Sequence, residues 1–245
     1  MGKYNTENNI KVQLLNMSSN PEEMMATAAR LCYSKYSIDE ILEKMKNGNE
    51  TECKNMIDKI MTSGHYSVLE HCTFTFSVEN ISRVTEIQLL RTRTASPSVQ
   101  SGRYVDRSNV KYMIPPKVAA SHKATEVYLN LVSNANKAYE EITNILKEEN
   151  PDMNIKSILE DARYVQPQSL TTKLIFTIDL RNFINLVQHR RCKRAQWEIR
   201  KVVNMMFDLV RPNLPNVSKY IGANCETSYC KEGSMSCKNP IKKTI

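Results

Sequence analysis

The chain has 245 residues, of which 41% are hydrophobic and 24% charged, and it contains only 6 glycines and 9 prolines. This composition excludes a fibrous or low-complexity protein and predicts a folded, soluble one with a substantial core. An apolar run of about 18 residues and a secretory signal are both absent, so we expect a cytoplasmic protein without a membrane partner. The formal net charge of +8 favours anionic partners.

The first 64 residues have the pattern of one strand followed by three helices. Pro21 stands at a typical first helical position, Ser37 is a typical N-cap, and Gly64 is a typical residue just beyond a helix end. The predicted elements are a strand over residues 10–17 and helices over residues 21–33, 38–47 and 51–63.

In the middle of the chain, segments with strand-like spacing alternate with segments that have helical spacing. Residues 71–80 alternate with period two, which predicts a strand, and residues 81–92 return to helical spacing. Residues 102–114 are expected to form a strand that follows an arginine-rich loop. Apolar residues at three- and four-residue steps over residues 121–149 predict one long amphipathic helix.

The remaining segments complete an α+β pattern. We expect a helix over residues 151–165 beginning at Pro151, a strand over residues 169–178, and helices over residues 179–191 and 195–210. No repeat or linker divides the chain. The sequence therefore predicts a single domain in which mixed helices surround a mostly antiparallel sheet, with a cysteine-containing tail over residues 221–245.

The seven cysteines are expected to be reduced thiols, because no signal directs the chain to an oxidising compartment. Four are isolated and predicted to be small buried hydrophobes: Cys32, Cys53, Cys72 and Cys192. Three lie in the tail, namely Cys225, Cys230 and Cys237. Since a structural zinc site needs four ligands, we expect no metal there.

Arginines cluster where a phosphate would be held. The chain has no glycine-rich phosphate loop, but "RTRTASPSVQSGRY" over residues 91–104 combines three guanidiniums with five hydroxyls before its final tyrosine. Arg91 and Arg93 end a predicted helix and Ser101 begins the next element, so the turn suits a phosphate. The alternative is that Arg91 and Arg93 only complement the helix dipole.

A second arginine cluster lies on the helix predicted over residues 179–191. Arg181 and Asn185 are four residues apart and share a face, whereas Arg190 is about 180° away around the helix axis. Such a helix presents polar groups on two opposite sides. A helix between two bound ligands has this pattern, and so does a surface helix with scattered polar residues.

Four segments, in order, resemble the motifs of the flavin-dependent thymidylate synthase family, over about residues 10–220. "RTRTASPSVQSGRY" is similar to the family signature of Arg-His-Arg, seven residues, then Ser-Gly-Arg-Tyr. The other segments are "SGHYSVLEHCTFTFSV", "DARYVQP" and "DLRNFINLVQHRRCKRAQWEI". The resemblance identifies residues 1–220 as the domain of this family.

The resemblance implies a homotetramer whose sites are shared between subunits. Each site binds FAD, the nucleotide dUMP and a folate. Methylenetetrahydrofolate supplies the one-carbon unit, NADPH reduces the flavin, and the flavin hydride completes the methyl group at C5 of dUMP. The reaction needs no cysteine nucleophile and yields dTMP.

Site residues follow from the resemblance, position by position. Arg190 and His65 match catalytic positions, where a fixed guanidinium favours the pyrimidine ionised at N3 and a histidine lines the flavin and folate pocket. The nucleotide positions are Gln88, Arg91, Val99, Gln100, Ser101, Gly102, Arg103, Arg163 and Arg190. The FAD positions are Ser67, Arg91, Thr92, Arg93, Asp179, Arg181 and Asn185.

The chain diverges from the family within its signature. Thr92 replaces a histidine, Ser98 and Val99 replace Asn and Glu, Asp179 replaces an Asn, and Tyr66 replaces a Glu. One alternative is therefore C5 modification of another pyrimidine nucleotide. Another is a basic nucleic-acid-binding protein, which the scarcity of aromatic residues (5 Phe, 1 Trp) disfavours.

Overall fold

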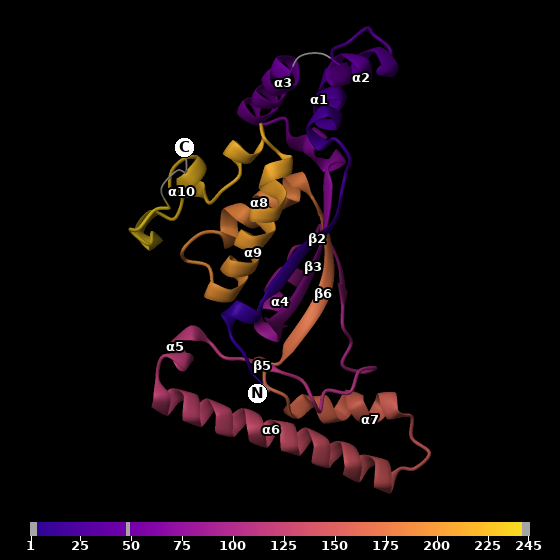
Figure 1. The fold of residues 1–245 in the computed structure, drawn as a ribbon, viewed down its shortest axis with the longest axis vertical. Coiled ribbons are helices and arrows are strands. Elements are labelled where there is room, and N and C mark those ends of the chain that lie inside the picture. Colours follow the sequence, from indigo (N-terminus) through magenta and orange to yellow (C-terminus); the bar gives the residue numbers. More distant parts are fainter. Residues whose placement is uncertain (1–3, 48–49, 242–245) are drawn as a thin grey trace. The chain divides into compact units, whose positions relative to one another are not determined.

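The computed structural model describes residues 4–47 and 50–241 (Figure 1). The chain folds into two compact units, each assembled from segments that are distant in the sequence. The first unit comprises residues 1–11, 78–91 and 98–175, and the second comprises residues 12–77, 92–97 and 176–245. The division cuts across strands, so no linker separates the units.

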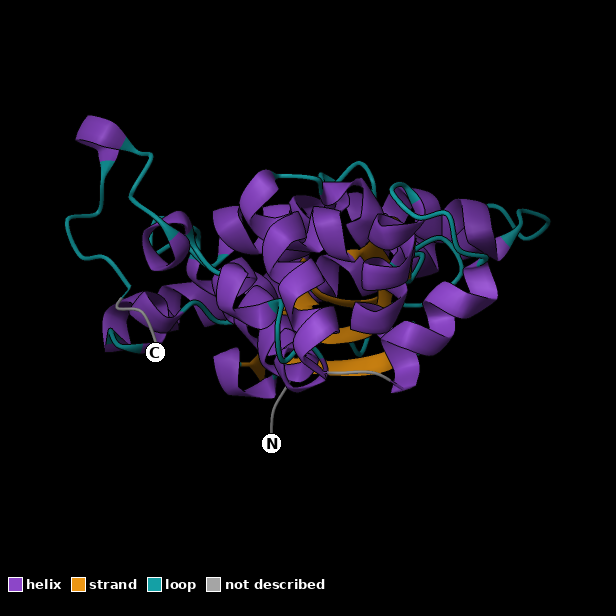
Figure 2. Cartoon of the chain, turned by 90° about the horizontal axis from the view of Figure 1, so that it is seen from above, coloured by secondary structure: helices purple, strands orange, loops and turns teal. Residues whose placement is uncertain are grey.

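A four-stranded antiparallel sheet has the strand order β2-β3-β6-β4. Its strands are β2 (Lys11–Met17), β3 (Thr73–Ser82), β6 (Thr171–Asp179) and β4 (Ser96–Val99). Figure 2 shows the strands in orange among the helices. Three of these strands match the sequence prediction, and the α+β class is confirmed.

In the second unit, helices pack on an aromatic core. Phe74 and Phe76 of β3 contact Phe183 of α8, with ring centroids 5.4 and 5.9 Å from that of Phe183. The helices of this unit are α1 (Pro21–Leu31), α2 (Ile38–Asn47), α3 (Glu50–Ser63), α8 (Leu180–Arg190), α9 (Trp197–Val210) and α10 (Asn224–Thr227). Phe183 therefore anchors α8 on β3.

Local signals read from the sequence explain where these helices begin and end. Pro21 opens α1, and Ser37 forms a capping box with Glu40, whose backbone N–H donates to the serine Oγ over 3.3 Å. Gly64 ends α3 with φ +76°, a conformation that glycine adopts without strain, and its N–H donates to the Ile60 carbonyl.

In the first unit, two small clusters form the core around the long helix α6 (His122–Glu149). Tyr112, Val132 and Leu170 form one cluster, and Tyr139 packs with Leu159 of α7 in the other. Figure 1 shows α6 and α7 side by side. The other elements of this unit are β1 (Tyr4–Asn5), paired in parallel with β5 (Tyr112–Met113), and the helices α4 (Arg83–Leu90), α5 (Pro116–Ala119) and α7 (Ile155–Ala162).

The strand predicted over residues 102–114 is wrong except at Tyr112–Met113. Asp106 accepts a hydrogen bond from the backbone N–H of Ser108 over 2.9 Å, and the Tyr139 hydroxyl accepts one from the Arg107 N–H over 3.2 Å. Side chains thus satisfy the backbone groups that a strand would pair with a neighbour. The strand forms instead inside the expected loop, as β4.

Two helix starts are also corrected. Residues 81 and 82 belong to β3, and Ser82 caps α4 through a hydrogen bond from the Thr85 N–H. The helix predicted from Pro151 begins only at Ile155, because Asn154 accepts a hydrogen bond from the Lys156 N–H over 2.9 Å. In both places a side-chain cap decides the boundary.

The long helix over residues 122–149 is confirmed, but the apolar stripe that predicts it is not its buried face. The helix buries Val132, Asn136, Tyr139 and Thr143, and the two polar side chains are hydrogen-bonded. Val127 and Leu131 in the stripe are 71% and 60% exposed. The part of the stripe around Val127 and Leu131 is therefore exposed, whereas Ile142 farther along packs against the cluster of Tyr139 and Leu159.

The cysteines only partly follow the prediction. Cys53 and Cys72 are buried, whereas Cys192 is half-buried and Cys32 is exposed at the end of α1, where its side chain faces solvent. Among the residues that the structure describes, no helix has both the length and the apolar character needed to cross a membrane. The same residues contain no cluster of three potential metal ligands.

Candidate active site

Helix α8 carries three of the predicted site residues, Arg181, Asn185 and Arg190, and a fourth is its N-cap. Asp179 is its N-cap, and its two carboxylate oxygens accept hydrogen bonds from the backbone N–H and the side-chain amide of Asn182, over 3.0 and 2.6 Å. The helix buries Leu180, Phe183, Ile184, Leu186 and Val187. Its polar residues therefore lie on the remaining faces.

One cavity of the second unit, with a volume of about 420 Å³, is lined by Arg181, Asn185 and Gln188 of α8. We call it the Arg181 cavity. Its other lining residues are Tyr66, Glu70, Thr94, Asn182 and Ile184. Arg181 and Asn185 were predicted to share a face and a ligand, and the structure brings both of them to this cavity.

The Arg181 guanidinium is already paired within the cavity. Its Nη1 lies 2.6 Å from Oε1 of Glu70, and both side chains are about half exposed. An ion pair this exposed contributes about 0–1 kcal/mol, because water screens it. A stronger anion therefore displaces Glu70 at little cost.

A second cavity, of about 340 Å³, lies at the other end of α8 and is lined by Arg190, His189 and Cys192. We call it the Arg190 cavity. Gln188 lines both cavities. The polar groups of α8 thus line two different cavities.

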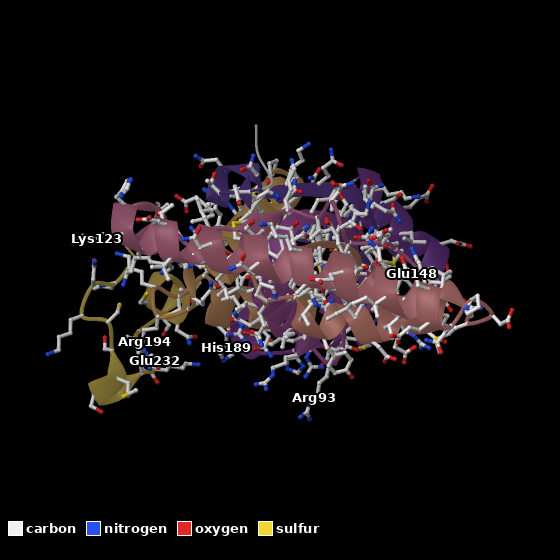
Figure 3. All side chains as sticks on the ribbon, turned by 90° about the horizontal axis from the view of Figure 1, so that it is seen from below. Arg93, Lys123, Glu148, His189, Arg194 and Glu232 are labelled. Atoms are coloured by element: carbon white, nitrogen blue, oxygen red, sulfur yellow. The ribbon has the colours of Figure 1, made fainter. Side chains whose placement is uncertain are left out.

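The C-terminal tail forms one wall of the Arg190 cavity, which sequence reasoning missed. The tail residues that line it are Ala223, Asn224, Cys225, Cys230, Lys231 and Glu232. Two ion pairs hold this wall to the segment after α8: Arg191 pairs with Glu226 over 2.8 Å, and Arg194 pairs with Glu232 (Figure 3). The tail is therefore part of the site architecture.

His65 and Ser67 are exposed at the start of the 3-10 helix Tyr66–His71. Neither residue lines the Arg181 cavity, whereas Tyr66 and Glu70 from the same short helix do. Glu70 and Gln188 had no prediction. Gln188 follows Asn185 by three residues on α8, a spacing that places both on one side of the helix. No spacing signal marks Glu70, because residues four apart on a 3-10 helix point in different directions.

The arginine-rich loop contributes residues to both units. Arg91 is the C-cap of α4, and Arg93 is exposed with its side chain directed outward (Figure 3). Thr92 and Arg93 belong to the second unit, together with His65, Ser67, Asp179, Arg181, Asn185 and Arg190. The other predicted positions belong to the first unit: Gln88, Arg91, Val99, Gln100, Ser101, Gly102, Arg103 and Arg163. Apart from Arg91, the predicted flavin positions therefore fall in the second unit, and apart from Arg190 the nucleotide positions fall in the first.

A tight turn follows Gln100 in the first unit. The Gln100 N–H donates to the Lys173 carbonyl of β6 over 3.1 Å, which anchors the start of the turn. Ser101 Oγ accepts a hydrogen bond from the Arg103 N–H over 3.3 Å, and the Ser101 carbonyl accepts from Tyr104 and Val105. The backbone of residues 100–105 is thus held in one conformation.

Two arginines with nucleotide assignments lie at α7. Arg103 pairs with Glu160 over 2.6 Å, and Arg163 is the C-cap residue of the helix. The side chains of Arg103 and Glu160 are both partly exposed, so their ion pair contributes little to stability. As in the Arg181 cavity, replacing the glutamate by another anion would cost little free energy. The first unit therefore presents guanidiniums beside a fixed backbone turn.

Comparison with known proteins assigns the family. The family model described as thymidylate synthase complementing protein matches residues 13–216. The flavin-dependent thymidylate synthase of Clostridium tetani is 38% identical over 234 residues, which cover 93% of each chain. That of Geobacter sulfurreducens is 39% identical over 230 residues, 93% of this chain and 94% of the relative, and that of Pyrococcus furiosus is 32% identical over 244 residues, 96% and 95%. The chain therefore belongs to the flavin-dependent thymidylate synthase family.

Proposed function

We propose that this chain catalyses the reductive methylation of dUMP to dTMP, with methylenetetrahydrofolate as one-carbon donor, FAD as cofactor and NADPH as reductant. The relatives that match nearly the whole chain are named flavin-dependent thymidylate synthases, which supports the reaction. The observation that carries the proposal is the placement of Arg181 and Arg190 in separate cavities on one helix. The reaction needs two ligands held side by side.

The Arg181 cavity has the donors that a flavin dinucleotide needs. Arg181 supplies a guanidinium for an anionic or carbonyl group, and the side-chain amides of Asn185 and Gln188 supply both donors and acceptors. When bound, FAD supplies the reducing equivalents for the methyl group. Of the remaining positions, Ser67, Thr92, Arg93 and Asp179 stay predictions from the resemblance.

Arg190 is proposed to act on the pyrimidine ring. A guanidinium fixed at the end of a packed helix stabilises negative charge that develops on the ring as N3 ionises, and this charge makes C5 nucleophilic. Cys192 lines the same cavity, but the proposal gives its thiol no covalent role. Replacing Cys192 by Ser is therefore expected to preserve turnover.

The phosphate of dUMP is proposed to bind in the first unit. Arg91, Arg103 and Arg163 supply positive charge, and the turn at Ser101 and Gly102 supplies a hydroxyl and backbone N–H groups. Gln88, Val99 and Gln100 complete the proposed nucleotide positions. His65 is proposed to line the flavin and folate pocket.

We also propose that the chain forms a homotetramer with sites shared between subunits. The exposed part of the apolar stripe in the N-terminal half of α6, with Val127 and Leu131, supports an interface with another copy. Residues 1–220 are proposed as the catalytic domain and residues 221–245 as its tail. Light scattering should give four times the 28.2 kDa of one chain, and Leu131→Glu should lower that mass.

Three measurements test the function. A host deficient in thymidylate synthase that expresses this chain should grow without thymidine, the purified protein should show flavin absorption bands, and dUMP should bind in a titration. Failure to grow despite soluble, flavin-loaded protein would overturn the proposal. Colourless protein with tight, steeply salt-dependent oligonucleotide binding would favour the nucleic-acid alternative. Location in the cytoplasm stays a prediction.

A further inference from the structure

Arg107 is a buried cation directly beneath the proposed nucleotide turn. Its side chain and backbone are only 8% exposed, although the residue lies in an irregular segment of the first unit. Its Nη2 donates a long hydrogen bond, 3.5 Å, to the Gln100 carbonyl. Its backbone N–H donates to the Tyr139 hydroxyl over 3.2 Å, which ties the residue to α6.

The Arg107 guanidinium occupies the space where Gly102 would carry a side chain. A Cβ atom placed on Gly102 would lie 2.6 Å from Cζ and 2.7 Å from Nε of Arg107. Real Cβ atoms do not approach other atoms that closely. A side chain at position 102 would therefore displace the Arg107 guanidinium from its place beneath the turn.

The charge on Arg107 is not neutralised by a neighbouring carboxylate. Within the described part of the chain, no Asp or Glu oxygen lies within 4.0 Å of its guanidinium, and the nearby Glu86 pairs with Arg83 instead. Burial is the main cause that lowers the pKa of Arg107; the charges of Arg83 and Arg163 act in the same direction, and the charge of Glu86 opposes them only in part. A buried guanidinium is costly unless an anion or several acceptors compensate it.

We propose that Arg107 is a positioning residue for nucleotide binding: it supports the Gln100–Gly102 backbone from behind and adds positive charge to the site of Arg103 and Arg163. The inference rests on the proposed function, because it assumes that the turn at Ser101–Arg103 binds the dUMP phosphate. A bound phosphate would supply the anion that the buried charge lacks.

Replacement of Arg107 by Met removes the charge and the hydrogen bond while keeping an unbranched side chain in the same space. The dissociation constant and KM for dUMP should rise about tenfold or more, the effect of losing one charged donor. The value of kcat and the flavin spectrum should stay close to those of the wild type. Arg107→Lys should recover part of the affinity, and Lys111→Met, which removes an exposed charge from the same unit, should change nothing.

A double-mutant cycle tests the contact with Gly102. Gly102→Ala alone should weaken dUMP binding, because the new methyl group displaces the guanidinium. In an Arg107→Ser background that group is gone, so the same change should cost clearly less. If the factor by which the double variant weakens dUMP binding equals the product of the factors of the two single variants, Gly102 and Arg107 act independently. That result would contradict the proposal.

Hydrogen exchange on the ligand-free protein separates this inference from the proposed function. The backbone amides of residues 100–105 should exchange faster in Arg107→Met than in the wild type, while the middle of α6 keeps its protection. If the amides of Arg107→Met exchange at the wild-type rate, the positioning role is overturned even if dUMP binds. Faster exchange in a variant that keeps the wild-type affinity for dUMP would overturn it as well. A wild type that binds no dUMP would instead refute the proposed function, and exchange alone would then decide whether Arg107 holds the turn.

Discussion

Arg181 and Arg190 occupy the two ends of α8 and line two different cavities, while Gln188 between them lines both. The helix is held in place by Phe183, which packs on the aromatic side chains of β3. Two ligands bound in these cavities would therefore be kept at a fixed separation. Replacing each of the two arginines is therefore expected to affect a different ligand.

Replacement of Arg190 by Ala should abolish dTMP formation while the protein keeps its flavin. The loss should be at least about 100-fold in kcat, because a fixed cation that stabilises developing charge acts mainly in the transition state. Product formation and the flavin absorption spectrum provide the two readouts. Arg30→Ala is the matched control, since Arg30 is an exposed arginine of the same unit that lines neither of the two cavities. Equal activity of the Arg190 variant would remove Arg190 from the reaction.

Replacement of Arg181 by Ala should weaken FAD binding about tenfold, because Arg181 is the only arginine among the described residues that line this cavity. Glu70→Gln should act in the opposite direction and tighten binding, since the guanidinium would no longer be paired with Glu70. Titration of the flavin-free protein, followed by flavin fluorescence, measures both. Wild-type affinity in Arg181→Ala would show that FAD does not use this cavity.

Asp179 is expected to stabilise the fold because its side chain caps the N-terminus of α8. Asp179→Ala removes both hydrogen bonds to Asn182 and should lower the free energy of unfolding by about 1 kcal/mol. Asp179→Asn should cost little, because asparagine caps helices equally well, and it restores the residue usual in the family. Urea unfolding compares the two variants. An equal loss of stability in both would mean that the carboxylate charge, and not the cap, is what stabilises the helix.

The buried thiols should resist alkylation at pH 8. Burial raises the pKa of Cys72 to about 12 and that of Cys53 to about 11, so at pH 8 both remain protonated and unreactive. Exposed Cys32 and Cys230 should react with iodoacetamide in the folded protein. Mass spectrometry of the labelled peptides measures each site, and rapid labelling of Cys72 without unfolding would contradict its burial.

Much of the fold could be predicted because its signals are local. Pro21, the Ser37 capping box and the glycine at position 64 set helix ends through contacts within one turn. The two-sided character of α8 follows from the spacing of Arg181 and Arg190 at 3.6 residues per turn. Hydrogen bonds and side-chain directions over such short distances depend on neighbouring residues alone.

The turn at residues 100–105 could not be predicted, because its partners are distant in sequence. Residues 102–114 have the alternation of a strand, but Tyr139 of α6 takes the Arg107 N–H and Lys173 of β6 takes that of Gln100. The same holds for the burial of Arg107, which depends on the absence of a side chain at Gly102. No local pattern marks a buried arginine.

The length and type of α6 were set by its own residues, whereas its orientation was decided by packing. The helix turns Asn136 inward, where its side-chain amide donates to the Ser108 carbonyl of a distant segment, and it leaves Leu131 exposed. Buried Thr143 donates only to the Tyr139 carbonyl of the same helix. The tail likewise became a wall of the Arg190 cavity through the ion pair of Glu226 with Arg191. Periodicity defines which residues share a face, but only contacts between distant segments decide which face is buried and what it lies against.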